Sequence, residues 1–527
     1  MDSSWEIPKN LNWDKIKDDA IGIDLGTTRC CCAVSRSKGV IETVALDNGG
    51  ERLLPSFIGY DEKNVKCGQI VVDRINNYSK STVFDVKRII GRKFSNITVD
   101  PSWTFSLKSD NDDNPLIETT NHCGNLKTLL PSQVSAVLLK HIKTKSEEFQ
   151  GKKLKNVVVT VPAVFSNQQC EKTIEAANLA EFDSVTLLPE PIAAAFSYFF
   201  DREIPNNSKM LLFDLGGGTL DVCVFKIFND KINIISKSGD SEIGGRNFDN
   251  ILFRYLKQKL ENEFNINDID KKKYKLLRKC QEIKESLSAV NDYSFDVSDF
   301  ETSIDAFIKI TRDKFEQLSN DLMGEIKTTI NMALNDKNIQ PNEINSILLV
   351  GGGSRMPMIK NLLHNIFPNA EQRIEVNPDE AVAKGAAYYA CHLLSNMELN
   401  DQILAESNSE FRDKNVFLKD IKKGPDEVAS LLPGRGTMES TIVIFPHGLI
   451  EGETTLIANH WLFGFKGGVQ VHVYDKDKNL LWKSPWRIFG VYMNPTSTRR
   501  WDHMIPEEFL SKIKSVSIIH KHNSQIN

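Results

Sequence analysis

The sequence predicts an α/β protein: a large domain of two related lobes, followed by a small β-rich domain. Apolar, strand-like runs alternate with long segments of helical periodicity up to about residue 395, which is typical of α/β layers. A pattern of apolar strand, Asp, Gly and Thr occurs twice, at Asp24 and at Asp214. The composition also changes near residue 400: all nine cysteines lie at or before Cys391, but six of the ten histidines follow residue 440.

The length and composition of the chain indicate how many folded units, which partners and which compartment to expect. Its 527 residues exceed the roughly 250–300 that one hydrophobic core spans, so we expect two or three packed units. A formal net charge of -5 argues against general nucleic-acid binding. The first twenty residues lack the apolar run of a secretory signal, and no stretch is apolar enough to cross a membrane. We therefore expect a soluble, cytoplasmic protein without a membrane partner, whose cysteines, including the adjacent Cys30–Cys32, are reduced thiols.

The pattern along the chain predicts the individual elements. Residues 20–60 predict a β-meander of AIGIDLGT, CCCAVSR and VIETVALD, and KMLLFDLGGGTLDVCVFKIFNDKINIISK repeats its strand-turn pattern. SQVSAVLLKHIKTKSEEFQ and KKYKLLRKCQEIKESLSA have helical periodicity. A further strand, INSILLVGGGS, ends in glycines before a helix. The repeat predicts two lobes that face each other.

Three of these strands end in glycine turns that suit phosphate binding. Glycine lets backbone amides approach phosphate oxygens, threonine hydroxyls add donors, and a carboxylate can hold the water shell of Mg²⁺. One such turn fits a tight hairpin equally well, but three with two matching aspartates favour a polyphosphate site; the chain has no P-loop motif. The turns are Asp24-Leu25-Gly26-Thr27-Thr28, Asp214-Leu215-Gly216-Gly217-Gly218-Thr219 and Gly351-Gly352-Gly353-Ser354-Arg355.

Eight segments, in order across residues 20–395, resemble the signatures of the DnaK-type heat-shock chaperones. They are IGIDLGTT, TVFDVKRIIGRKF, VVVTVPAVF, LLPEPIAAAFSY, LLFDLGGGTLDV, IGGRNFDN, ILLVGGGSRMP and NPDEAVAKGAA. The resemblance implies an actin-like, two-lobed ATPase domain that binds ATP or ADP with Mg²⁺, held through water, and with K⁺. Sugar kinases and actin share only the two hairpins and lack the lysine-bearing TVFDVKR segment.

The resemblance also implies roles for individual residues. Asp24 and Asp214 surround the metal ions, and Lys87 reaches the γ-phosphate, where a fixed cation stabilises transition-state charge. The alternative for Lys87 is a solvated lysine on a helix. Glu190 orders the attacking water with Asp214 or Asp221, although Asp221 fits a hairpin-flanking acid equally well. The implied catalytic set is Lys87, Glu190, Asp214 and Thr219, and the implied phosphate-binding set is Gly26, Thr27, Thr28, Arg29, Gly216, Gly217 and Gly218.

The implied nucleoside side departs from the family at two positions. Relatives have glutamate and arginine where this chain has Gln281 and Glu285, and that arginine lies against the adenine. Its loss removes a contact of ~0.5–2 kcal/mol, so the sequence predicts weaker binding, looser adenine selectivity and tighter ATP binding by Glu285→Arg. The implied residues are Gly244, Gly245, Gln281, Lys284, Glu285, Ser288, Gly352, Gly353, Ser354, Arg355 and Asp379.

The segments that couple nucleotide to peptide in the family are altered. Val164 and Cys170 replace a tyrosine and an arginine that senses the nucleotide, and a thiol cannot make the same forked contact. The surface for J-domain partners has Thr186, Pro189 and Ile192 where relatives have arginine, asparagine and threonine. We therefore expect J-domain docking and the usual coupling to be lost.

Residues 431–527 read as a small β-sandwich or barrel that resembles no family known to us. GVQVHVY and LLWK, joined by DKDKN, predict a hairpin. Its four tryptophans line a binding surface or, more simply, fill a core. His520 and His522 share one face of a strand but lack a third metal ligand nearby. The tryptophans are Trp461, Trp482, Trp486 and Trp501.

These observations predict an ATP-binding, slowly ATP-hydrolysing chaperone. The alternative is a nucleotide-gated scaffold with a weak ATPase whose β domain binds a protein partner. Unfolded polypeptide and a nucleotide exchange factor are further partners that the resemblance implies. The predicted organisation is an N-terminal extension over 1–19, the ATPase domain over 20–395, a polar, partly helical linker over 396–430 and the β-rich domain over 431–527.

Overall fold

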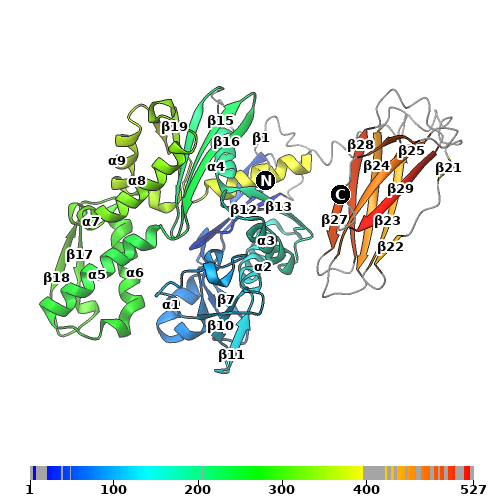
Figure 1. Ribbon diagram of the computed structural model, residues 1–527. Coiled ribbons are helices and arrows are strands. Elements are labelled where there is room, and N and C mark those ends of the chain that lie inside the picture. The colour runs from blue at the N-terminus through cyan, green and yellow to red at the C-terminus, as the bar shows by residue number, and fades with distance from the viewer. Residues whose placement is uncertain are drawn as a thin grey trace. The chain divides into compact units, whose positions relative to one another are not determined.

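The chain folds into two compact units, Met1–Leu399 and Asn400–Asn527, in the computed structural model (Figure 1). In the first unit the structure describes residues 4–7, 20–36, 39–47, 49–200, 202, 206–374 and 376–395; in the second it describes strands and a few flanking positions. Among the helices so described, none combines the length and the apolar character needed to cross a membrane.

Two six-stranded sheets form the centre of the first unit and repeat one strand order. In the first sheet, order β13-β12-β2-β3-β4 with β5 also on β3, an antiparallel meander is joined to two parallel strands. The second sheet, order β1-β16-β15-β14-β19-β20, again joins a meander to two parallel strands. The shared order is the structural counterpart of the repeat seen in the sequence.

The strands that the sequence predicts are present, except that only the first part of VIETVALD is a strand, and the structure adds others. The first sheet consists of β2 (Ile21–Asp24), β3 (Arg29–Ser35), β4 (Ile41–Thr43), β5 (Leu53–Pro55), β12 (Asn156–Val161) and β13 (Ser184–Pro189). The second consists of β1 (Ser4–Glu6), β14 (Lys209–Leu215), β15 (Leu220–Phe228), β16 (Lys231–Asp240), β19 (Ser346–Val350) and β20 (Glu371–Arg373).

Helices cover both sheets and fill the space between them. Helices α2 and α3 pack on the first sheet and, with it and α1, form the first lobe; α5 to α9 pack on or beside the second sheet and form the second lobe (Figure 1). Helix α4 and a helix over residues 381–395 share one core with both sheets. The bounds are α1 (Gln69–Tyr78), α2 (Pro131–Gln150), α3 (Asn167–Leu179), α4 (Glu190–Phe199), α5 (Gly245–Phe264), α6 (Lys273–Leu287), α7 (Arg312–Leu318), α8 (Asn320–Asn335) and α9 (Pro357–Ile366).

Close backbone packing joins the two central helices. A Cβ atom at Gly385 would lie 1.6 Å from the carbonyl oxygen of Ala193 in α4, so only glycine fits there.

Small strands extend the lobes: β6 (Ile58–Gly59), β7 (Lys66–Cys67), β8 (Thr82–Val83), β9 (Ser106–Ser109), β10 (Pro115–Thr120), β11 (Leu126–Leu129), β17 (Asp292–Asp296) and β18 (Phe307–Thr311).

The predicted N-terminal extension contributes a strand to the ATPase unit. Strand β1 pairs antiparallel with β16 at the edge of the second sheet. Trp5 meets Tyr389 edge to face, with ring centroids 6.0 Å apart, and Ile7 is buried. These contacts explain why residues 4–7 of the predicted extension pack on the domain.

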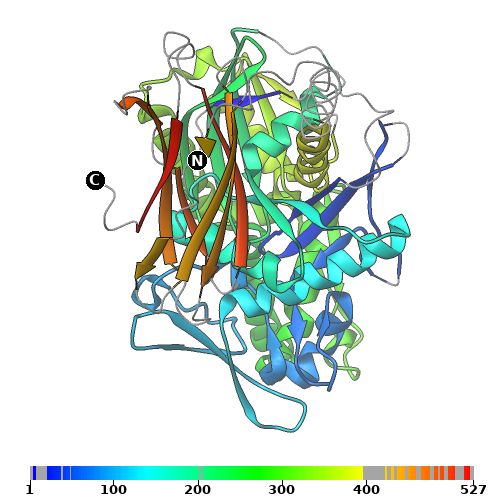
Figure 2. The same ribbon diagram turned by 90° about the vertical axis from the view of Figure 1, so that its right-hand side faces the viewer.

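The described strands of the second unit form two sheets (Figure 2). Strands β25 and β26 pair antiparallel on either side of residues 475–479, where the sequence predicts a hairpin. Residues 396–421, Trp461 and Trp486 lie outside the described residues, as do the side chains of Trp482, Trp501, His520 and His522. The bounds are β21 (Lys422–Lys423), β22 (Ala429–Leu432), β23 (Gly436–Ile444), β24 (Leu449–Ala458), β25 (Phe465–Tyr474), β26 (Leu480–Lys483), β27 (Arg487–Val491), β28 (Thr496–Met504) and β29 (Ser515–His522).

The core of the second lobe predicts a stability difference between two phenylalanines. Phe248 is fully buried and meets Phe315 edge to face, whereas the side chain of Phe307 is 63% exposed. We expect Phe248→Ala to lower the free energy of unfolding by about 3–5 kcal/mol, because it leaves a cavity, and Phe307→Ala by less than about 0.5 kcal/mol. Urea unfolding of both variants measures this, and equal losses would contradict the packing described above.

Candidate nucleotide site

A cleft of about 950 Å³ is lined by residues from both lobes. It brings together nearly all of the residues that the sequence singled out, although they come from segments far apart in the chain. The predicted residues that line it are Asp24, Gly26, Thr27, Thr28, Arg29, Lys87, Glu190, Asp214, Gly216, Gly217, Thr219, Gly245, Gln281, Lys284, Glu285, Gly352, Gly353, Arg355 and Asp379.

Four other predicted residues lie behind this lining. Gly218 and Gly244 pack against each other, since a Cβ atom on Gly244 would lie 2.5 Å from the Gly218 Cα. Ser288 donates a hydrogen bond to the Lys284 carbonyl at 3.1 Å, and buried Ser354 donates to the Gly351 carbonyl at 2.7 Å. These residues shape the walls of the cleft and do not face it.

The tips of the two glycine hairpins meet at the floor of the cleft. A Cβ atom at Gly217 would lie 2.2 Å from Thr28 Oγ1, so glycine is required for this approach. The Gly216 amide donates to the Thr219 carbonyl at 3.0 Å and closes the second hairpin. The buried hydroxyl of Thr27 has no hydrogen-bond partner. Buried polar groups in proteins are almost always hydrogen-bonded, so an unpaired one is an exception that needs an explanation. A bound ligand oxygen, such as a phosphate oxygen, would accept the hydrogen bond of this hydroxyl.

Lys87 lies on a short 3₁₀ turn, Val86–Arg88, which directly follows a residue with a strained backbone conformation. Asp85 before it has φ 62 and is fully buried. This left-handed conformation is held by Trp103 Nε1, which donates to the Asp85 carboxylate at 3.1 Å, and by an ion pair with Arg246 of α5. As a result, Lys87 Nζ lies 2.5 Å from Glu190 Oε1 inside the cleft. Glu190 is the first residue of α4, where the helix dipole favours a carboxylate.

A surplus of buried negative charge surrounds Lys87. Asp214 and Asp221 stand directly opposite each other in the β14–β15 ladder, which places two carboxylates on one face. Burial, reinforced by Glu190, raises the pKa of Asp221 to about 7 and that of Asp214 well above its usual range. Burial likewise raises the pKa of Asp24 to about 7, although Lys87 opposes the shift. Burial disfavours the charged form of Lys87, but Glu190 and Asp24 outweigh it and raise its pKa to about 12.

This charge distribution fits a divalent cation. One lysine cannot neutralise the four carboxyl groups around it, and burial together with the neighbouring carboxylates raises the pKa values of Asp24, Asp214 and Asp221. Oxygen ligands and room for several waters are what Mg²⁺ prefers. Within the described parts of the chain, no three His, Cys, Asp or Glu side chains are close enough to share a metal directly.

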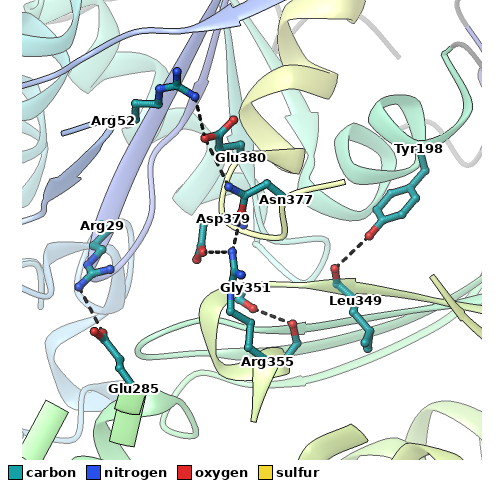
Figure 3. Close-up of polar contacts among 11 residues, drawn as sticks. Arg29, Arg52, Tyr198, Glu285, Leu349, Gly351, Arg355, Asn377, Asp379 and Glu380 are labelled. Atoms are coloured by element: carbon teal, nitrogen blue, oxygen red, sulfur yellow. Dashed lines mark hydrogen bonds and ion pairs between the residues drawn. The ribbon is translucent and has the colours of Figure 1, made fainter. Parts of the chain in front are cut away.

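The opposite end of the cleft is lined by α6 and the loop after β19 (Figure 3). Lys284 Nζ lies 2.8 Å from the Asp249 carboxylate of α5 and 3.0 Å from the Gly245 carbonyl, so it fixes α6 to the second lobe. Arg355 lies 2.8 Å from the carboxylate of Asp379 and also contacts Asn377. Glu285, where the family resemblance implied an arginine, lies 3.4 Å from Arg29 of the first lobe.

The sequence reasoning missed several residues of this site. It left the role of Asp221 open, and only the strand register shows that it lies opposite Asp214. It also missed Asp85 and Arg246, which position Lys87. Each lies within or next to a recognised segment, but their pairing joins parts of the chain far apart and gives no local signal.

The raised pKa of Asp221 predicts a pH dependence of stability in the metal-free protein. Between its ordinary pKa of 3.8 and about 7, the unfolded chain loses the proton while the folded protein keeps it, so stability falls as pH rises. Asp221→Asn removes this penalty. In EDTA, the melting temperature of Asp221→Asn relative to the parent should rise by a few degrees from pH 5 to pH 7 and then level off. Asn in place of the exposed Asp305 is the control, and a pH-independent difference for both variants would contradict the charge assignment.

Known proteins share the sequence features of this cleft. The sequence model of the family described as Hsp70 protein matches residues 20–409. The chain is 34% identical over 496 residues to heat shock cognate 70 kDa protein 3 of Dictyostelium discoideum, covering 91% of the chain and 75% of that protein. It is also 34% identical to heat shock 70 kDa proteins of Neurospora crassa and Ajellomyces capsulatus, covering 71% of the chain but only 58% and 53% of those proteins. On this evidence, the chain belongs to the Hsp70 family of heat-shock proteins.

Proposed function

We propose that the protein is a chaperone of the Hsp70 type that binds ATP with Mg²⁺ and slowly hydrolyses it to ADP and phosphate. The observation that carries this proposal is the Lys87–Glu190 pair among buried carboxylates, opposite two glycine hairpins in one cleft. Bound Mg²⁺ would offset part of the negative charge of the phosphates and the carboxylates. K⁺ is a further candidate, and Asp24 and Asp214 are the residues that would hold the metal waters.

The chain's own groups have separate tasks in this proposal. Backbone amides of the glycine hairpins and the hydroxyls of Thr27 and Thr219 bind the phosphates. Lys87 supplies a fixed cation where negative charge develops during phosphoryl transfer, and such preorganised charge is the main source of catalysis for this reaction. Glu190 holds the lysine in place and, with Asp221, accepts hydrogen bonds from the attacking water.

The C-terminal unit is proposed to bind a protein, either unfolded polypeptide or a specific partner, through its β-sheets. The scaffold alternative keeps nucleotide binding but loses turnover, so a turnover measurement separates the two functions. The cytoplasm is the compartment that we propose for this member of the family. A nucleotide exchange factor remains a partner implied by the family.

Two substitutions test the proposed catalytic residues. Lys87→Ala removes the cation that faces the transferred group, and Thr219→Ala removes a phosphate donor. We expect phosphate release to fall by about 10²-fold for Lys87→Ala and by a smaller factor for Thr219→Ala. Lys108→Ala, which changes an exposed lysine paired with Glu118, should retain the parent rate. If the parent turns over and both cleft variants keep its rate, the site is assigned wrongly.

The altered coupling residues lead to a further prediction. Cys170 is half-buried and cannot make the forked contact of an arginine. Instead, Lys237 of the second lobe donates to the Ala163 carbonyl and joins this loop to β16. Because coupling needs an element that both sites bias, we expect a J-domain protein or an unfolded peptide to change phosphate release by less than about twofold. Stimulation of several-fold by either would show that coupling survives by another route.

A further inference from the structure

One face of α6 contacts the first lobe at two places, one on α1 and one on Arg29, the residue that follows the first glycine hairpin. Arg278, Gln281 and Glu285 recur at spacings of three and four, so they share this face. Arg278 Nη1 lies 2.9 Å from Asp73 Oδ1 of α1, and Glu285 Oε1 lies 3.4 Å from Arg29 Nη2 of β3. All five side chains line the cleft, so both ion pairs cross its opening.

The two ion pairs have opposite polarity. The second lobe supplies the cation of one pair, Arg278, and the anion of the other, Glu285. Gln281 lies between them in the helix and donates to the same Glu285 oxygen at 2.9 Å. Figure 3 shows the carboxylate of Glu285 facing Arg29. A shift of α6 along the first lobe would bring like charges together, so the pattern favours a single closed arrangement of the two lobes.

We infer that these two pairs form a clasp that holds the cleft closed over bound nucleotide and sets its rate of release. The inference rests on the proposed nucleotide binding. Because Lys284 anchors α6 to α5, opening of the cleft must separate Arg29 from Glu285 and Asp73 from Arg278. All four clasp side chains are 43–64% exposed, so each pair contributes modestly and is weakened by salt.

The clasp gives Glu285 a different role from the one that the sequence suggests. Taken alone, the missing arginine predicts that Glu285→Arg restores a contact with adenine and tightens binding. In the structure, Glu285→Arg would instead set two guanidinium groups against each other across the cleft. Glu285 is thus a positioning residue that acts through Arg29.

The experiment measures release of radiolabelled ADP from the full chain after a chase with unlabelled ATP. We expect Arg29→Glu and Glu285→Arg each to speed release by about two- to fivefold, because each replaces an attraction by a repulsion. The double variant Arg29→Glu with Glu285→Arg restores opposite charges and should return most of the parent rate. Raising the salt concentration should speed release from the parent. Lys140→Glu breaks an exposed pair with Glu181 that lies wholly within the first lobe, and it is the matched control.

The outcomes separate the clasp from the proposed function. Rescue in the double variant, with no change in Lys140→Glu, supports the clasp. If ADP binds but release is unchanged in both single variants, or if Glu285→Arg slows release, the clasp is wrong while nucleotide binding stands. If the parent retains no ADP at all, both the proposed function and the clasp are overturned.

Discussion

The contact between Lys87 and Glu190 is the interaction on which the rest of the cleft depends. It places one buried cation among Asp24, Asp214 and Asp221, whose charges cannot all be stable in a protein interior without further positive charge. The carboxyl groups of the cleft therefore outnumber its lysine, and a divalent cation such as Mg²⁺ would offset part of this excess. The same carboxyl groups would favour a nucleotide that binds together with its metal ion.

The fold supplies this arrangement by using one supersecondary pattern twice. Each sheet begins with a meander whose first hairpin ends in glycines, and each continues into parallel strands. The two hairpins meet at Gly217 and Thr28 because the helices between the sheets pack with almost no space, as at Gly385. A larger side chain at either contact would push the lobes apart and separate the phosphate-binding loops, so packing far from the cleft contributes to its geometry.

The nucleoside end of the cleft shows that the expected effect of a substitution depends on the residues that surround it in the structure. Judged from the sequence alone, Glu285 implies that a stacking contact is lost. In the structure, however, Glu285 forms an ion pair with Arg29. A guanidinium is present on the opposite wall, at Arg29, and its carboxylate partner on α6, Glu285, accepts a hydrogen bond from Gln281 of the same helix. Comparison of single positions with relatives and the ion pair in the structure therefore lead to opposite predictions for Glu285→Arg, and the ADP-release experiment distinguishes them.

By itself, the sequence determined the α/β class, the repeat, several strands and two helices of the first unit, and many of the residues that line the cleft. These predictions rest on local signals, such as apolar periodicity and the glycine turns beside Asp24 and Asp214. Such signals can be read from the sequence without knowing which residues contact each other in the fold. Only the tertiary structure decided that Ser4–Glu6 form an edge strand, that Asp221 faces Asp214, and that Asp85 and Arg246 hold the turn bearing Lys87. Each of these depends on strand register or on charges brought together from distant segments, and the free energy of such contacts leaves no local pattern in the chain.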